Sequence, residues 1–145
     1  MPAKTQILRN RAFFGQDGRC FYCGVTMWLA SPVELPLEHP KPRPSAAAQL
    51  KCTAEHLVAK SEGGRDVAEN IAAACLHCNW TRHQRKRPPS PEVYRADVRR
   101  RVERGAWHDR WVFERGLLPS HLKPSQAGAY MEYFPYTPER PTTCS

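Results

Sequence analysis

The 145-residue sequence lacks any long apolar run. No stretch approaches the roughly 20 consecutive apolar residues that a membrane-spanning helix needs. The first residues, MPAKTQILRNRAFFGQDG, lack the apolar segment of a secretory signal peptide. We therefore expect a protein of the reducing cytoplasm with no membrane partner. In that compartment paired cysteines more often hold metal than form disulfides.

Internal repeats and coiled-coil heptads are also missing from the sequence, which argues against a solenoid or a long coiled coil. The length favours one domain. The 14 prolines and 8 glycines indicate much irregular backbone. A chain this short with so many loops buries a small core, so an additional cross-link such as a bound metal is expected.

Acidic residues are scarce relative to basic ones, and the net charge is +8. Between Arg82 and Arg104, nine basic residues stand against three acidic ones. This clustering favours a nucleic-acid partner over a merely solubilising surface, because each neutralised phosphate releases counterions. The basic residues that we expect to contact nucleic acid are Arg82, Arg85, Lys86, Arg87, Arg95 and Arg99.

Several segments have recognisable secondary-structure patterns. A short helix followed by a glycine-containing turn is expected within residues 10–27. Residues 50–58 and 70–75 have the apolar, branched composition of strands. A helix is expected from about Cys78 to Arg87, where two prolines end it. Between Pro32 and Pro44 there are five prolines, so this stretch is predicted to be a loop within an insertion of about residues 32–49.

A further helix is predicted within residues 90–107. Ser90 can cap it, Pro91 suits the first helical position, and Glu92 complements the positive helix end. Its apolar stripe, with the arginines expected to face outward, consists of Tyr94, Val98 and Val102.

Two Cys-x-x-Cys pairs, Cys20 with Cys23 and Cys75 with Cys78, predict a metal site. Two-residue spacing lets both sulfurs of a pair reach one tetrahedral ion at about 2.3 Å, so two pairs can close a structural zinc site. The alternatives are free core cysteines or a redox Cys-x-x-Cys. Because 51 residues separate the pairs, the metal would tie the N-terminal segment to the second strand and the helix after it.

Residues 55–83, EHLVAKSEGGRDVAENIAAACLHCNWTRH, combine a Glu-His pair with Asn79 and His83, four residues apart. Residues four apart share a helix face, whereas Glu55 and His56 on a strand point to opposite faces unless the backbone bends. If that helix face packs across the strand end, Glu55, Asn79 and His83 offer two oxygens and one nitrogen. This set suits Mg²⁺, Mn²⁺ or another divalent ion with open positions. His56 would be free to take a proton from water.

This pattern resembles the HNH endonuclease family. The matching residues are the Glu-His pair at 55–56, Gly63-Gly64, Asn70, and CLHCN at 75–79 followed by His83; the resemblance covers roughly residues 20–86. It implies an α+β fold: a small ββα-metal core stapled by the four-cysteine zinc site, with additional helices and Pro-rich loops. Two positions depart from the family pattern, with Ala59 where members often have proline and Glu55 where Asp is more frequent.

The resemblance also implies roles for particular residues. His56 is the general base, Asn70 ties the loop between the strands and orients that base, and the metal-ligand positions are those of Glu55, Asn79 and His83. The expected activity is metal-dependent hydrolysis of phosphodiester bonds, with double-stranded DNA as the favoured substrate. The products would have 5′-phosphate and 3′-hydroxyl ends. The alternatives are a zinc-stapled nucleic-acid-binding module without catalysis, and an RNase. One active site cuts one strand, so both a nicking monomer and a homodimer that cuts both strands stay open.

We divide the chain into a nuclease core at 1–89, which contains both Cys-x-x-Cys pairs (the zinc knuckles), and an extension at 90–145 that packs on this core. The remaining cysteines are expected to be a core residue, Cys52, and an exposed tail thiol, Cys144. Structural roles are expected for His39, His77, His108 and His121, with His77 facing solvent. Packing over the core, with base stacking as the alternative, is expected for Trp107, Trp111, Tyr130, Tyr133 and Phe134.

Overall fold

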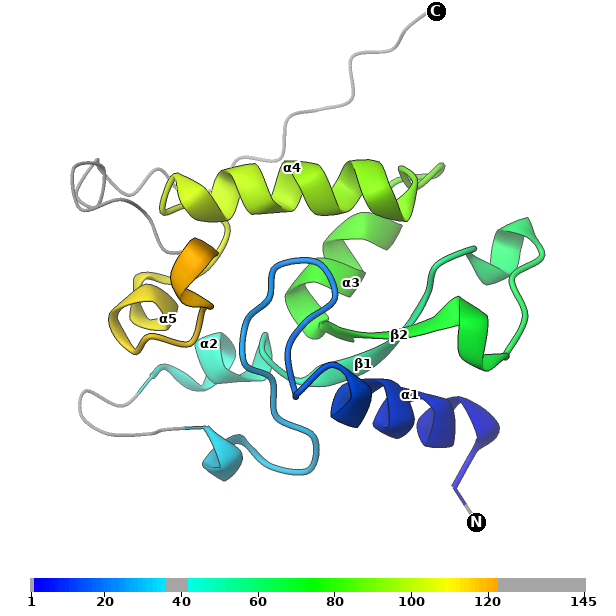
Figure 1. The fold of residues 1–145 in the computed structure, drawn as a ribbon, viewed down its shortest axis with the longest axis horizontal. Coiled ribbons are helices and arrows are strands. Elements are labelled where there is room, and N and C mark those ends of the chain that lie inside the picture. The colour runs from blue at the N-terminus through cyan, green and yellow to red at the C-terminus, as the bar shows by residue number, and fades with distance from the viewer. Residues whose placement is uncertain (1, 36–41, 123–145) are drawn as a thin grey trace, which may run out of the picture.

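The computed structural model describes residues 2–35 and 42–122 (Figure 1). Its helices and strands are α1 (Lys4–Gly15), α2 (Pro44–Ala48), β1 (Cys52–His56), β2 (Ile71–Cys75), α3 (Leu76–His83), α4 (Pro91–Glu103) and α5 (Arg110–Glu114). Within the described ranges, no helix is both long and apolar enough to cross a membrane. The expectations that fall outside these ranges concern His39, Tyr130, Tyr133, Phe134 and Cys144.

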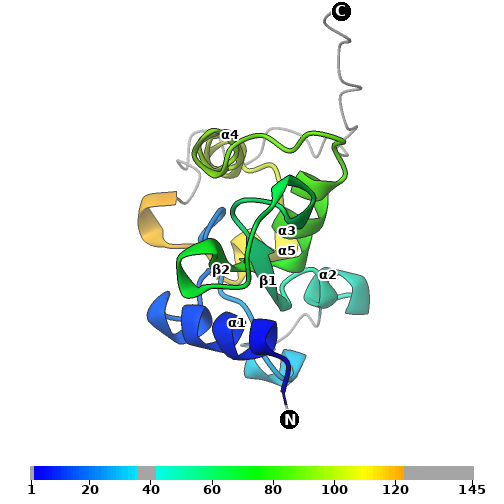
Figure 2. The same ribbon diagram turned by 90° about the vertical axis from the view of Figure 1, so that its right-hand side faces the viewer.

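The centre of the fold is the antiparallel pair β1–β2, which confirms both predicted strands. All five residues of β2 are buried, and three of them are alanines. Such small side chains let helices approach a sheet closely. Accordingly, α1 packs on one side of the hairpin and α3 on the other (Figures 1 and 2). The fold is therefore the predicted α+β arrangement of a hairpin followed directly by a helix.

Helix α1 begins earlier than the sequence suggested, at Lys4, and it is anchored to the sheet at its end. The side-chain amide of Gln16 accepts a hydrogen bond from Ala73 N at 3.0 Å and donates one to Ala73 O at 2.9 Å. These two bonds satisfy backbone groups of β2 that no third strand pairs with in the described part of the chain. Gln16 thus fixes α1 and the cysteine segment after it against β2.

Helix α3 spans Leu76–His83, so the predicted span from Cys78 to Arg87 was wrong at both ends. It starts earlier because the sulfur of Cys75 accepts a hydrogen bond from Cys78 N and caps the helix. It ends earlier because the chain turns back after His83, and the guanidinium of Arg82 bonds to Pro89 O. Residues 85–87 therefore follow α3 in an irregular segment.

Helix α4 confirms the capping prediction, since the Ser90 hydroxyl accepts a hydrogen bond from Val93 N. Its buried residues are the predicted Tyr94, Val98 and Val102. The hydroxyl of Tyr94 donates to Cys78 O at 2.6 Å, which joins α4 to α3. These side chains belong to one hydrophobic core that also contains the four paired cysteines and Trp111.

The Pro-rich insertion contains two short helical segments. Pro32–Glu34 forms a 3₁₀ turn capped by Ser31, and α2 starts at Pro44. Each has proline in its first turn, where the missing N–H removes no helical hydrogen bond. The sequence predicted a loop here, so α2 is an addition. It lies beside the core because Trp28 Nε1 donates to Ala47 O at 2.8 Å.

Candidate functional site

The four paired cysteines, Cys20, Cys23, Cys75 and Cys78, converge on one point. Their sulfurs all lie within 4.8 Å of one another, and all four residues are buried. A tetrahedral ion with metal–sulfur bonds of about 2.3 Å requires sulfurs about 3.8 Å apart. The sulfurs of Cys23 and Cys75 are 3.9 Å apart, far longer than the roughly 2.05 Å of a disulfide. The cluster is therefore arranged to hold a metal ion, as the sequence predicted.

The ionisation of these thiols also favours a cation. Burial raises the pKa of the thiols of Cys23, Cys75 and Cys78 above the usual range. Burial opposes ionisation of Cys20 too, but hydrogen bonds from the neighbouring thiols outweigh it and lower its pKa. Because three of the four thiols resist deprotonation without a counter-charge, a bound metal ion is the group that would convert the whole cluster to thiolates.

Two side chains from the extension reach the cluster, and no sequence pattern predicted either contact. Trp107 Nε1 donates to the sulfur of Cys78 at 3.2 Å, and His108 Nε2 lies 3.1 Å from the sulfur of Cys23. Burial lowers the pKa of His108 to about 3. His77, which was expected to face solvent, is packed against the rings of Trp107 and His108 at centroid distances of 4.7 and 5.6 Å. That expectation was wrong because the segment after α4 folds over the second cysteine pair, which contains His77.

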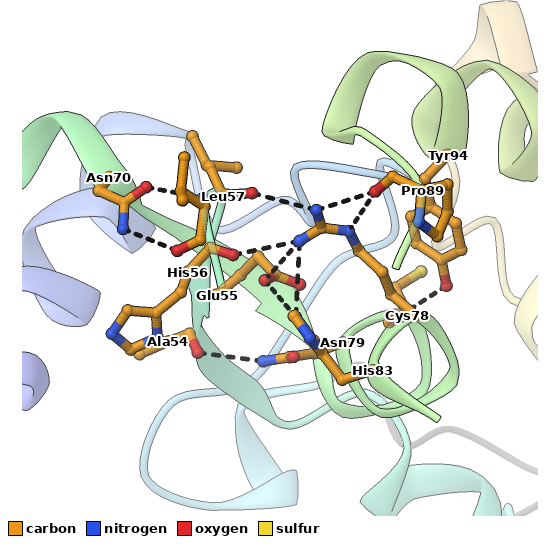
Figure 3. Close-up of polar contacts among 12 residues, drawn as sticks. Ala54, Glu55, His56, Leu57, Asn70, Cys78, Asn79, His83, Pro89 and Tyr94 are labelled. Atoms are coloured by element: carbon orange, nitrogen blue, oxygen red, sulfur yellow. Dashed lines mark hydrogen bonds and ion pairs between the residues drawn. The ribbon is translucent and has the colours of Figure 1, made fainter. Parts of the chain in front are cut away.

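Glu55 is the centre of the second group of polar residues (Figure 3). It is fully buried, and its Oε1 lies 2.7 Å from His83 Nε2 and 3.0 Å from a guanidinium nitrogen of Arg82. Its other oxygen, Oε2, is buried and has no hydrogen-bond partner among the described residues. Burial raises the pKa of Glu55, and the contacts with His83 and Arg82 oppose that shift without cancelling it.

Arg82 was expected to contact nucleic acid, and the structure contradicts this. The residue is only 2% exposed. Besides Glu55, its guanidinium donates to three backbone carbonyls, those of His56, Leu57 and Pro89, at 2.9 to 3.1 Å. All of its hydrogen-bonding capacity is therefore directed inward, where it joins the end of β1 to α3 and to the segment after it.

Asn79 lies on the same side of α3 as His83 (Figure 3). Its amide nitrogen donates to Thr53 Oγ1 at 2.9 Å and to Ala54 O at 3.0 Å. This orientation commits the nitrogen to β1 and leaves the amide oxygen as the atom that a cation could use. The predicted trio of Glu55, Asn79 and His83 is therefore gathered at the contact between β1 and α3.

His56 is the last residue of β1, and its side chain leaves the strand in a different direction from that of Glu55 (Figure 3). Its Nε2 lies 2.7 Å from Oδ1 of Asp66, a residue to which the sequence reasoning gave no role. The hydrogen bond from His56 is the main cause that lowers the pKa of Asp66. Asp66 comes ten residues after His56, a separation from which the contact could not be inferred.

Asn70 spans the loop between the strands, as the resemblance implied. Its Oδ1 accepts a hydrogen bond from Val58 N at 2.8 Å, and its Nδ2 donates to Val58 O and Arg65 O at 3.1 Å. Gly64 packs so closely against the chain leaving β1 that an added Cβ would lie 1.7 Å from Val58 O. The amide and the glycine together hold the loop that carries Asp66 against the end of β1.

The basic residues separate into two groups. Arg85, Lys86 and Arg87 are exposed. Arg95 and Arg99 are half-buried: the guanidinium of Arg95 lies 4.9 Å from the centroid of the Phe21 ring, and Arg99 Nε donates to Tyr22 O. The expectation that the arginines of α4 all face outward was therefore wrong for these two, because they attach α4 to the first cysteine pair.

The fold and the site define a small α+β domain in which a β-hairpin and the following helix carry the polar group around Glu55, and in which the segment after α1 adds Cys20 and Cys23 to Cys75 and Cys78 in a buried cluster positioned to hold a metal ion. Residues 45–85 match the family model described as HNH endonuclease. Over this segment the chain is similar to that family, in agreement with the resemblance seen in the sequence. The match includes β1, β2 and α3, and leaves the first cysteine pair and the extension outside. Comparison with curated proteins and with solved structures finds no match.

Proposed function

We propose that this protein is a divalent-metal-dependent endonuclease that hydrolyses phosphodiester bonds in double-stranded DNA, with a structural zinc ion in the four-cysteine site. The family match supports nuclease chemistry in general. The observation that carries the finer proposal is the meeting of Glu55 and His83 across β1 and α3, with Asn79 on the same side of α3 as His83 (Figure 3). A module that only binds nucleic acid has no need for this set.

These three side chains fit a catalytic divalent ion. Glu55 has a buried carboxylate oxygen without a partner, and such an atom is costly unless something binds it. The imidazole of His83 and the amide of Asn79 complete a mixed oxygen and nitrogen set. Arg82 already gives Glu55 one positive charge, so an ion would share the carboxylate with it. When bound, the ion supplies charge stabilisation to the phosphate and to the departing oxygen.

His56 is the proposed general base. It takes a proton from a water molecule, the water oxygen attacks phosphorus, and the bond to the 3′ oxygen breaks; the departing oxygen takes a proton from solvent. His56 is the last residue of β1, and its side chain is 16% exposed, so water can reach the ring. Its backbone carbonyl accepts from Arg82 at 3.1 Å, which fixes the strand end that carries the ring.

The exposed residues Arg85, Lys86 and Arg87 follow α3 directly, and they are the proposed contacts to the phosphate backbone. Their position beside His83 suits a role in holding DNA near the cleaved bond, and contacts of this kind carry little sequence information. Arg95 and Arg99 contact Phe21 and Tyr22, so only the parts of their guanidinium groups outside these contacts contribute to this surface.

The proposal is tested by incubating zinc-loaded protein with supercoiled plasmid in the presence of EDTA, Mg²⁺, Mn²⁺ or Ni²⁺. We expect nicked or linear product only when a divalent ion is added, and none from His56→Ala. His121→Ala is the matched control, because His121 is exposed and distant in sequence from the site; it should cleave like the wild type. Plasmid that is bound yet intact with every metal would favour the non-catalytic module, and cleavage of RNA alone would favour an RNase.

A further inference from the structure

Asp66 contacts His56, the proposed general base, and has no role in the function proposed above. Its Oδ1 is 2.7 Å from His56 Nε2, and its Oδ2 is 3.8 Å from the ammonium of Lys60. The side chains of His56 and Asp66 are 16% and 32% exposed. A contact this accessible contributes little to stability, even when both groups are charged, so a contribution to folding does not account for it.

The contact determines which nitrogen of His56 carries a proton. The His56 hydrogen bond lowers the pKa of Asp66, so its carboxyl group is ionised at neutral pH. An ionised carboxylate can only accept hydrogen bonds. The atom facing it, Nε2, must therefore be protonated and donate. In a neutral imidazole this leaves Nδ1 as the unprotonated nitrogen.

The loop holds Asp66 in this place through contacts that do not involve Asp66 itself. Asn70 binds the carbonyl of Arg65, the residue before Asp66, at 3.1 Å. Gly64 N donates to Ala59 O at 2.9 Å, and no larger residue fits at position 64 without displacing Val58 O. The carboxylate is therefore presented to the ring by a braced loop.

We propose that Asp66 is a positioning residue for His56: it accepts the Nε2 proton, fixes the orientation of the ring and presents Nδ1 as the atom that takes a proton from water. This role of Asp66 in catalysis rests on the proposed nuclease function. Once Nδ1 has taken the proton, the ring is a cation with both nitrogens protonated, and the Asp66 carboxylate faces it as a counter-charge. Asn70 then acts on the base in part through Asp66, by holding the loop.

The first test is a spectroscopic one that does not depend on cleavage. Long-range ¹H–¹⁵N spectra are recorded on the zinc-loaded protein at pH 9, above the range in which imidazoles normally titrate. We expect His56 to show a protonated Nε2, with its proton protected from exchange, and an unprotonated Nδ1. In Asp66→Ala that proton should exchange freely with water. A wild-type His56 with protonated Nδ1, or with an unprotected Nε2 proton that Asp66→Ala leaves unchanged, would overturn the proposal.

The second test measures kcat and KM for plasmid cleavage by Asp66→Ala. We expect kcat to fall at least roughly tenfold, and by no more than the ~10²–10⁴ that a general base contributes. KM should not rise, because removing a negative charge favours DNA binding. Glu62→Gln is the matched control: it removes a charge from the same loop, at an exposed residue, and should leave kcat unchanged.

The outcomes distinguish the two proposals. If the wild type cleaves and Asp66→Ala cleaves with the same kcat, the positioning role is refuted while the nuclease stands. If the wild type cleaves nothing, the nuclease fails, and the spectra alone decide whether Asp66 holds the His56 ring. A loss of kcat shared by Glu62→Gln would show a general effect of charge and would also refute the role of Asp66.

Discussion

Replacing Arg82 with methionine separates an internal role for this arginine from a role in binding DNA. The sequence places Arg82 at the start of a basic segment, whereas the structure places its guanidinium against Glu55 and three backbone carbonyls, with 2% of the residue exposed. Methionine has a similar length and no charge. Arg82→Met therefore removes the charge and the hydrogen bonds while filling much of the same space.

The expected cost is large. Removing one partner of a buried ion pair typically destabilises a protein by about 3–5 kcal/mol, because the other charge is left without compensation. Here Glu55 keeps its contact with His83, which favours the lower end of that range. A loss of about 3 kcal/mol is a substantial part of the roughly 5–15 kcal/mol that stabilises a typical protein.

The assay is urea unfolding of the zinc-loaded protein, followed by circular dichroism, with DNA affinity measured under native conditions. Arg85→Met is the control, because Arg85 is exposed; its stability should change by less than about 0.5 kcal/mol. Its DNA affinity should fall, with a salt dependence reduced by about one phosphate contact. If Arg82→Met instead lost DNA affinity with a stability change below about 1 kcal/mol, the inward position of Arg82 would be wrong.

Three further results are expected. Removing a bound metal with a chelator, or changing Cys75 to serine, should lower the melting temperature strongly, because the ion would join two distant cysteine pairs and its binding free energy would add to the free energy of folding; an unchanged melting temperature would contradict a structural metal. Asn70→Ala loses three hydrogen bonds and should lower the free energy of unfolding, measured in urea, by about 1–3 kcal/mol. A decrease below about 0.5 kcal/mol would mean that the amide does not brace the loop. Burial raises the pKa of Cys52 to about 12, and an unfolded thiol ionises near pH 8.5, so the stability that Cys52 contributes below that pH should be lost as the pH rises toward 12. Cys52→Ala should lack this part of the pH dependence, and equal slopes for the two proteins above pH 8.5 would refute it.

Much of the core could be predicted from local signals. The strands have apolar, branched or small residues bounded by turn residues, and α4 has a serine cap, a proline at its first position and an apolar stripe. The four cysteines were found by their spacing, since two-residue spacing suits one tetrahedral ion. The proposed ligand trio could be selected from the sequence because Asn79 and His83 lie one helical turn apart and Glu55 stands beside the candidate base.

The errors concern residues whose place depends on distant parts of the chain. Arg82 resembles its basic neighbours in sequence, and only the burial of Glu55 next to it determines that it turns inward. Asp66 lies in an ordinary turn segment, and its contact with His56 exists because Asn70 and Gly64 fold the loop back. His108 and Trp107 reach the cysteine cluster only because the chain after α4 passes over the cysteine pairs.

The central claim is that His56 acts as a base at a preformed site and does not hold the DNA or the fold. The most direct test measures three quantities for His56→Ala beside the wild type: cleavage of plasmid with divalent ion added, DNA affinity, and bound zinc. The account predicts that cleavage is lost while DNA affinity and zinc content match those of the wild type. If DNA affinity or zinc content falls together with cleavage, or if His56→Ala cleaves at the wild-type rate, His56 is not the base.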